Sequence, residues 1–222
     1  MKIGIILDST KVSWYINDLV NWIKKDPNLE LEVLLIQNVV NKRKPILSAG
    51  ISKIVDRILF KIVNILERRL IYKKYPQYIK HFLKYDLRQL DIKELNVEFE
   101  RSNNGRNFNY KDETINKIKE LNLDIIIRGG SGILTGKILN SSKFGIISFH
   151  HGDNLVNRGG PSGFWEVYEK NPKTGFTIQI LTERLDGGNV IKRGNFKTEQ
   201  FYHLNQIILI ERSNYYMKTV LK

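Results

Sequence analysis

The sequence contains no cysteine and only four histidines among its 222 residues. The absence of cysteine excludes disulfide bonds, thiolate metal sites and a cysteine nucleophile. A zinc enzyme would need most of the four histidines, or carboxylates in their place. No apolar run is long enough to span a bilayer, and the start, MKIGIILDST, lacks the apolar core of a signal peptide. We therefore expect a cytoplasmic protein that folds as a single domain over residues 1–222.

Acidic residues are scarce relative to basic ones: 23 Asp and Glu stand against 36 Lys and Arg, a net charge of +13. Such an excess commonly indicates a nucleic-acid or anionic-membrane partner. However, residues 41–93 alone hold 14 Lys and Arg against 4 Asp and Glu, which is +10 of the +13. The rest of the chain is close to neutral, so we expect no nucleic-acid partner.

Short apolar runs alternate with helix-period patterns, which predicts an α/β protein with a mainly parallel, Rossmann-like sheet flanked by helices. Residues 2–7 and 31–36 are apolar strands, and a helix that ends at Lys25 lies between them, with Asp8, Ser9 and Thr10 as capping residues. Further predicted strands are 97–100, 123–128, 144–149, 174–181 and 190–196; further helices are 112–121, 164–168 and 204–221.

The basic stretch at about 41–93 has a different pattern, and we interpret it as a helical insertion rather than a separate domain. Apolar residues from Ile51 to Leu70 keep to helical spacing, with Lys and Arg on the other face. Residues 72–90 predict a second helix that begins near Pro76. A basic amphipathic helix can lie on a membrane surface, which makes contact through 51–70 one alternative. Packing on the sheet, or on a second subunit to form a homodimer, is the simpler expectation.

The densest group of chemically active side chains is ISFHHGDNLVNRGGPSGFW, residues 147–165. It lies where a predicted buried strand ends in a polar loop, which is where open α/β sheets bind ligands. His150 and His151 emerge there, and we expect one of them to point into a cleft and the other away. A second group is LDGGNVI, in which Asp186 precedes two glycines, although Asp-Gly-Gly is also a common hairpin turn.

The segments DIIIRGGSGIL, FGIISFHHGDN, RGGP and TGFTIQILTERLDGGNVI, in this order, resemble the catalytic core of the folate-dependent formyltransferases. That family includes glycinamide ribonucleotide, methionyl-tRNA and nucleotide-sugar N-formyltransferases, and the resemblance covers about residues 112–196. It implies a formyltransferase fold, 10-formyltetrahydrofolate as co-substrate and no metal. It also implies that His150 and Asp186 are catalytic, and that the folate pocket is formed by Arg128, Gly129, Gly130, Ser131, Gly132, Ile133, Leu134 and Gly187.

One departure from the family concerns the triplet that ends in His150. The family pattern is Asn-x-His, in which the asparagine amide donates to the oxyanion, whereas this chain has Ser148-Phe149-His150. Serine is shorter and donates one hydrogen bond, so we expect Ser148 to form a weaker or rearranged oxyanion site. His151 or Asn154 could substitute for the missing amide.

The identity of the formyl acceptor follows by elimination among the family's branches. The turn after the first strand has no glycine, unlike the phosphate-binding turn of the glycinamide ribonucleotide enzymes, and little sequence follows the last predicted core strand to serve as a tRNA-binding domain. The expected acceptor is therefore an amino sugar nucleotide for a surface polysaccharide. Its expected contacts are His151, Asn154, Arg158, Gly159 and Lys11, with the cations facing the diphosphate. The alternatives are a non-catalytic binding module with this fold and a formyltetrahydrofolate hydrolase.

Overall fold

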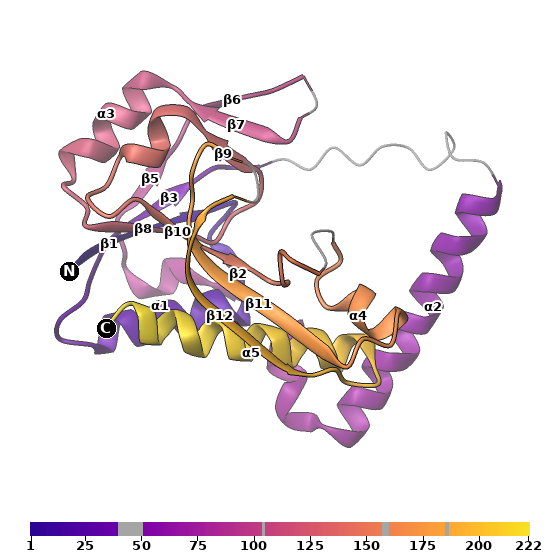
Figure 1. The fold of residues 1–222 in the computed structure, drawn as a ribbon. Coiled ribbons are helices and arrows are strands. Elements are labelled where there is room, and N and C mark those ends of the chain that lie inside the picture. The colour runs from indigo at the N-terminus through magenta and orange to yellow at the C-terminus, as the bar shows by residue number, and fades with distance from the viewer. Residues whose placement is uncertain (40–50, 104, 157–159, 185–186) are drawn as a thin grey trace.

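A seven-stranded sheet forms the centre of the molecule in a computed structural model that describes residues 1–39, 51–103, 105–156, 160–184 and 187–222. The strand order is β12-β11-β10-β8-β1-β3-β5 (Figure 1). The five parallel strands are β1 (Lys2–Leu7), β3 (Glu30–Ile36), β5 (Glu94–Asn96), β8 (Ile125–Arg128) and β10 (Ile146–His150). At the end of the sheet, β11 (Lys173–Ile180) pairs antiparallel with β10, and β12 (Asn189–Lys197) pairs antiparallel with β11. The expected mainly parallel α/β fold is confirmed.

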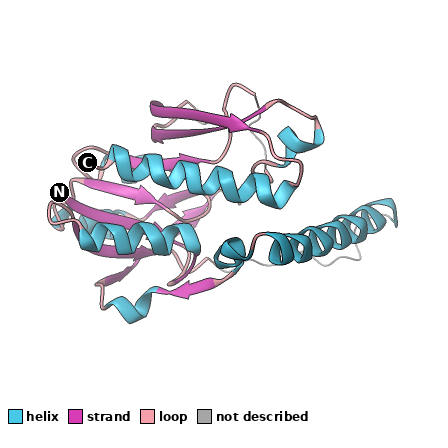
Figure 2. Ribbon diagram, turned by 90° about the horizontal axis from the view of Figure 1, so that it is seen from below, coloured by secondary structure: helices cyan, strands magenta, loops and turns pink. Residues whose placement is uncertain are grey.

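Helices cover both faces of this sheet. On one face lie α1 (Trp14–Lys25) and α5 (Tyr202–Val220), which run side by side (Figure 2). On the other lie α3 (Asp112–Glu120), the 3-10 turn η4 (Gly136–Asn140) and a small sheet of β6 (Phe99–Arg101), β7 (Asn107–Tyr110) and β9 (Ile133–Thr135). Alternation along β1 explains the two layers, because Ile3 and Ile5 pack toward α1 and α5 whereas Ile6 packs toward α3.

The predicted helix over residues 72–90 is wrong. This stretch forms the 3-10 turns η2 (Pro76–Phe82) and η3 (Leu87–Leu90), with the short strand β4 (Lys84–Asp86) between them. The backbone of β4 pairs with β2 (Lys11–Ser13), which holds it extended. In addition, the Asp86 carboxylate accepts from the backbone N–H of Arg88 at 3.1 Å. A side chain that binds its own backbone in this way competes with a continuous helix.

Two smaller expectations also fail. The residues Asp8 to Thr10 do not cap α1, because β2 intervenes and the helix begins after Ser13, whose side chain makes no capping hydrogen bond. Of the predicted strand 97–100, only Phe99 and Glu100 are in a strand, β6, because β5 ends before this stretch, at Asn96. In both places a tertiary pairing, rather than local pattern, decides the boundary.

The predicted helix that begins at Ile51 forms as α2 (Ile51–Lys74) and is longer than expected. It extends away from the sheet, and its C-terminal half approaches α5 and the short helix α4 (Phe164–Tyr168) (Figures 1 and 2). Residues 41–93 fall between β3 and β5, which are neighbours in the sheet. Within the described parts of the chain, no helix combines the length and the apolar character needed to cross a membrane.

Candidate active site

A cavity of about 100 Å³ lies at the carboxyl ends of the parallel strands. Because β8 and β10 are parallel, Arg128 and His150 end their strands at the same edge of the sheet. This edge is where ligands bind in open α/β folds. The residues that line the cavity are Arg128, Ile133, Leu134, Ser148, Phe149, His150, Gln179, Leu181, Thr182, Arg184 and Gly188.

The two histidines at the end of β10 lie on opposite sides of the strand. Ser148 and His150 both line the cavity, as expected for residues two apart in a strand. The ring of His151 instead stacks on Phe149 (centroids 5.4 Å apart) and meets Tyr15 edge-on at 5.4 Å. Its Nδ1 lies 3.1 Å from the hydroxyl of Ser213 in α5. His151 therefore faces the helical layer and does not line this cavity.

Burial gives His151 a different titration behaviour from that of an exposed histidine. Desolvation, together with the smaller effect of the neighbouring His150, lowers the pKa of His151 from 6.5 to about 4. The ring is therefore neutral near pH 7, and as such it can share one hydrogen bond with Ser213 in either direction. These properties suit a structural contact between β10 and α5.

An amide side chain that the sequence did not single out lies beside Ser148. Gln179 is directly opposite Ser148 in the antiparallel pair β10–β11, is buried, and lines the cavity. Its Oε1 accepts from Nδ2 of the buried Asn154 at 3.4 Å, whereas its Nε2 makes no hydrogen bond within the described ranges. The amide nitrogen is thus left as a donor toward the cavity. The sequence does contain a pattern that could have indicated Gln179: in TGFTIQIL, polar Thr177 and Gln179 alternate with isoleucines, which places both on one side of a strand.

Asp8 anchors the glycine-rich turn from Gly129 to Gly132. Its Oδ1 accepts from the backbone N–H of Ser131 at 2.9 Å, from the Ser131 hydroxyl at 3.1 Å and from Nε2 of Gln37 at 3.0 Å. A Cβ at Gly130 would lie 2.5 Å from that same amide nitrogen, and Gly132 has a φ of +81° with the ring of Phe108 in the way of any Cβ. These glycines allow the turn to fold against the end of β1.

Arg128 turns its guanidinium toward this loop, where Nη2 donates to the carbonyl oxygen of Gly132. Burial lowers the pKa of Arg128, while the nearby Tyr15 and Asp8 raise it. Among the described residues its Nε has no hydrogen-bond partner although it is buried. An unsatisfied buried donor on a cationic group is costly, and a bound acceptor in the cavity would relieve that cost.

The turn after β11 closes the other side of the cavity. The Thr182 hydroxyl donates to the Gly187 carbonyl at 3.2 Å, and the Gly187 N–H donates to the Arg184 carbonyl at 3.1 Å. A Cβ at Gly188 would lie 2.6 Å from the carbonyl oxygen of Ile180, so only glycine fits there. The predicted site residues Asp186, Arg158 and Gly159 lie outside the described residues.

Lys11 lies in a separate hollow of about 130 Å³, which is lined by Gly129, the residue after Arg128 of the cavity. Strand β2 carries Lys11, and the paired strand β4 carries Lys84, so two ammonium groups line this hollow together with Asp8, Ser9 and Tyr15. Lys11 and His150 therefore belong to different hollows along one edge of the sheet. Within the described residues, no three His, Asp or Glu side chains are grouped as a metal site would require.

Comparisons with known proteins point to one family. No family model matches the chain. Methionyl-tRNA formyltransferases from Bacillus pumilus and Bacillus subtilis are 35% and 33% identical to it over 83 and 89 residues. The matched segments are 37% and 40% of this chain, but they cover only 26% and 28% of those relatives.

Solved structures resemble the whole chain in fold. Phosphoribosylglycinamide formyltransferase from Brucella melitensis has a TM-score of 0.63 at 11% identity, covering 99% of this chain and 93% of that one. The corresponding protein from Bacillus halodurans has a TM-score of 0.58 at 16% identity, covering 96% and 90%. A formyltetrahydrofolate deformylase from Pseudomonas syringae has a TM-score of 0.54 at 11% identity, covering 96% of this chain and 59% of that one.

Proposed function

The chain belongs to the folate-dependent formyltransferase family, whose fold it has and whose sequence it shares in part, and on this premise we propose that it is an N-formyltransferase. It would move the formyl group of 10-formyltetrahydrofolate to the primary amine of an amino sugar nucleotide. One observation carries the proposal. His150 ends the central strand β10 and lines a cavity that it shares with two further polar side chains, Ser148 and Gln179.

The lining of the cavity fits the reacting end of 10-formyltetrahydrofolate. Ile133, Leu134 and Leu181 offer an apolar wall for a ring, and the orphaned Nε of Arg128 offers a donor for a polar atom at its edge. When bound, this co-substrate would supply a formyl carbon that an amine can attack. A volume of about 100 Å³ admits only part of such a molecule, so the remainder would extend past Thr182 and Arg184 at the rim.

The side chains of the cavity supply the chemistry of formyl transfer. As an imidazolium, His150 donates to the formyl oxygen, on which negative charge develops while the bond to the amine nitrogen forms. The Nε2 of Gln179 is a second donor from the neighbouring strand. Asp186, carried over from the family resemblance, favours the charged histidine and accepts the proton that the attacking amine releases. The bond from the formyl carbon to the folate nitrogen then breaks, and that nitrogen is protonated.

The proposed acceptor is consistent with the second hollow. Lys11 and Lys84 line it together with Asp8, and their two ammonium groups would suit a phosphate or diphosphate group. An amino sugar nucleotide carries both an amine and a diphosphate, so it could reach both hollows along the sheet edge. The name of the Bacillus relatives gives methionyl-tRNA as their acceptor. We do not propose this acceptor here, because the match covers only about a quarter of the length of those relatives.

The test is a transfer assay with 10-formyltetrahydrofolate and a panel of amino sugar nucleotides, followed by mass spectrometry of the product. We expect an N-formylated sugar and tetrahydrofolate in equal amounts, and neither product from the His150→Ala variant. Formate released without any amine would instead identify a hydrolase, a reaction consistent with the fold shared with the deformylase. Folate binding with no product in either assay would identify a binding module, which the presence of Ser148 in the catalytic triplet favours.

A further inference from the structure

Helix α2 is attached to the body of the protein along one side. Phe60 packs against the ring of Tyr202 (centroids 6.4 Å apart), and Ile71 is only 2% exposed. Between them, the carboxylate of Glu67 accepts from the backbone N–H groups of Tyr202 at 3.3 Å and His203 at 3.0 Å. Residues 60, 67 and 71 are spaced by seven and four, so they lie on one face of the helix.

The side of α2 turned away from these contacts is apolar and uncovered. We call it the α2 outer face, and it consists of seven aliphatic side chains that are each 48–56% exposed: Ile58, Leu59, Ile62, Val63, Ile65, Leu66 and Leu70. Single exposed aliphatic residues are ordinary, but a contiguous set of this size on one element marks a contact surface. The helix extends from the body in two perpendicular views (Figures 1 and 2), and the exposure of these seven side chains shows that the described residues leave them about half uncovered.

The charges of this segment have a single sign. Between residues 58 and 74 the exposed side chains that are charged at neutral pH are Lys61, Arg68, Arg69, Lys73 and Lys74, of which Arg68 also lies over the ring of Phe82. The one acid in this range, Glu67, is used against α5. A second copy of the chain would bring the same positive charges against the outer face, on a molecule whose net charge is already +13. An anionic surface would complement these charges.

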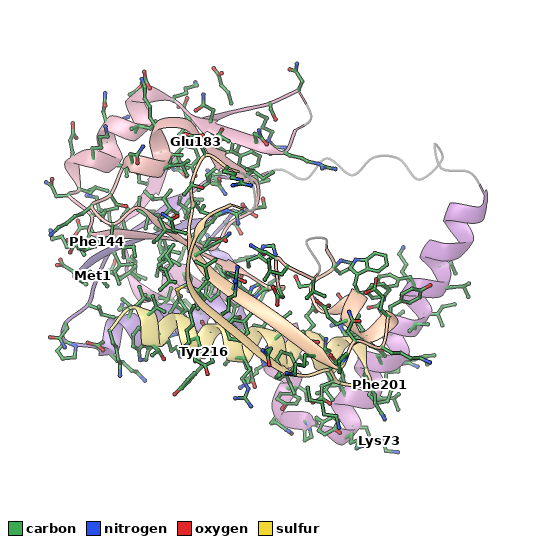
Figure 3. All side chains as sticks on the ribbon, in the orientation of Figure 1. Met1, Lys73, Phe144, Glu183, Phe201 and Tyr216 are labelled. Carbon is green, nitrogen blue, oxygen red and sulfur yellow. The ribbon has the colours of Figure 1, made fainter. Side chains whose placement is uncertain are left out.

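A hollow of about 540 Å³ continues the outer face at the C-terminal end of α2. Leu70, Ile71, Tyr75 and Phe201 form its apolar part, and Lys73 and Lys74 line it with ammonium groups. Lys73 and Phe201 lie together at this end of the helix (Figure 3). Apolar surface next to two cations is the chemistry that a lipid with an anionic headgroup needs.

We propose that the α2 outer face binds the surface of an anionic lipid bilayer. The aliphatic side chains enter the boundary between headgroups and acyl chains, and the flanking Lys and Arg side chains remain at the level of the phosphates. The helix lies in the plane of the membrane. This surface is separate from the cavity beside His150, so the proposal is independent of the formyltransferase assignment.

The test is co-sedimentation of the full chain with vesicles of phosphatidylcholine alone and of phosphatidylcholine mixed with phosphatidylglycerol. We expect at least about tenfold stronger binding to the mixed vesicles, with the difference declining as salt is added. The double variant Ile62→Gln, Leu66→Gln and the charge variant Lys73→Glu, Lys74→Glu should each lose at least about tenfold of that binding. The matched control is Phe144→Gln, because Phe144 is 53% exposed and lies at the opposite end of the molecule from α2 (Figure 3).

Circular dichroism checks that each variant keeps its helix content. One double variant changes apolar residues and the other changes charged residues, so either one tests the proposal if the other misfolds. Equal binding to neutral and mixed vesicles, or no binding to either, would overturn the proposal. A dimer seen by sedimentation velocity without vesicles, and dissolved by Ile62→Gln, Leu66→Gln, would assign the face to a second copy instead. Loss of vesicle binding in the Phe144→Gln control would also contradict the proposal that the α2 outer face binds the bilayer.

Discussion

The cavity at the sheet edge and the outer face of α2 depart from an ordinary globular protein in opposite ways. At the sheet edge, the polar side chains of Ser148 and Gln179 are buried, one oxygen of the half-buried Asp8 accepts three hydrogen bonds, and Gly188 leaves no room for a Cβ. On α2, aliphatic side chains are about half exposed and have no cover among the described residues. Buried polar groups imply chemistry that needs fixed geometry, whereas exposed apolar groups imply a contact surface.

The two regions also differ in what holds them. Ser148, His150 and Gln179 lie on strands of the central sheet, so these side chains are positioned by the backbone pairing of β10 and β11. The helix α2 is held by side chains along one side. Substitutions at the cavity should therefore change turnover with the fold intact, and substitutions on α2 should change binding to surfaces with turnover intact.

The largest effect is expected from His150→Ala and Asp186→Asn, each of which should lower turnover at least about a hundredfold. The reason is that one variant removes the donor to the developing oxyanion and the other removes the charge that supports it. Steady-state kinetics with 10-formyltetrahydrofolate and an amine measures the loss, with Phe144→Gln as a control. Near-normal turnover in either catalytic variant would contradict the assignment of that residue.

The second effect concerns stability rather than turnover. The pKa of His151 is about 4 in the folded protein against 6.5 for an unperturbed ring, so the unfolded chain binds the extra proton between these values. Stability is therefore highest above pH 6.5 and falls as the pH drops toward 4. Lowering the pH from 7 to 5 should therefore lower the free energy of unfolding by about 2 kcal/mol through this group.

Urea denaturation at a series of pH values measures this cost. In the variant His151→Gln the amide can keep a hydrogen bond to Ser213 but does not titrate, so its stability should fall less over the same range. Parallel pH profiles for the two proteins would show that other groups are responsible for the dependence.

Strand positions could be predicted from sequence because each buried strand is a local apolar run, as in Ile125 to Arg128 or Ile146 to His150. The position of Lys11 could not, since it depends on the pairing of β2 with β4, a strand more than seventy residues later in the sequence. Local pattern also failed over 72–90, where that same pairing interrupts the expected helix.

Within the site, alternation along β10 was sufficient to predict that Ser148 and His150 share a side of the strand and that one histidine points away. It could not indicate that Gln179 is opposite Ser148, because the register of β11 against β10 is a tertiary property. The orientation of the Arg128 side chain could not be predicted from the sequence either. Its guanidinium turns to the Gly132 carbonyl of its own loop, a contact that exists only once the glycine-rich turn is folded.

A smaller effect is expected for Gln179→Glu, which should lower kcat at least about tenfold with little change in KM. The substitution keeps the shape of the side chain and an acceptor for Asn154, but it replaces the donor Nε2 with a negative oxygen next to the place where negative charge develops. The variant Gln179→Leu serves as a control that removes the donor without adding a charge. Unchanged kcat in both variants would show that Gln179 does not donate in the transition state.

The smallest effect is expected from Ser148→Asn, which tests how the site tolerates its departure from the family pattern. Ser148 is 1% exposed, lines the cavity beside His150, and its hydroxyl donates to the Phe149 carbonyl at 3.1 Å. Asparagine there would place an amide donor toward the same oxygen as His150, so turnover should rise, or at least not fall. The comparison variant is Ser148→Ala. If Ser148→Asn abolishes activity while Ser148→Ala retains it, the oxyanion is held elsewhere and the alignment of this triplet with the family is wrong.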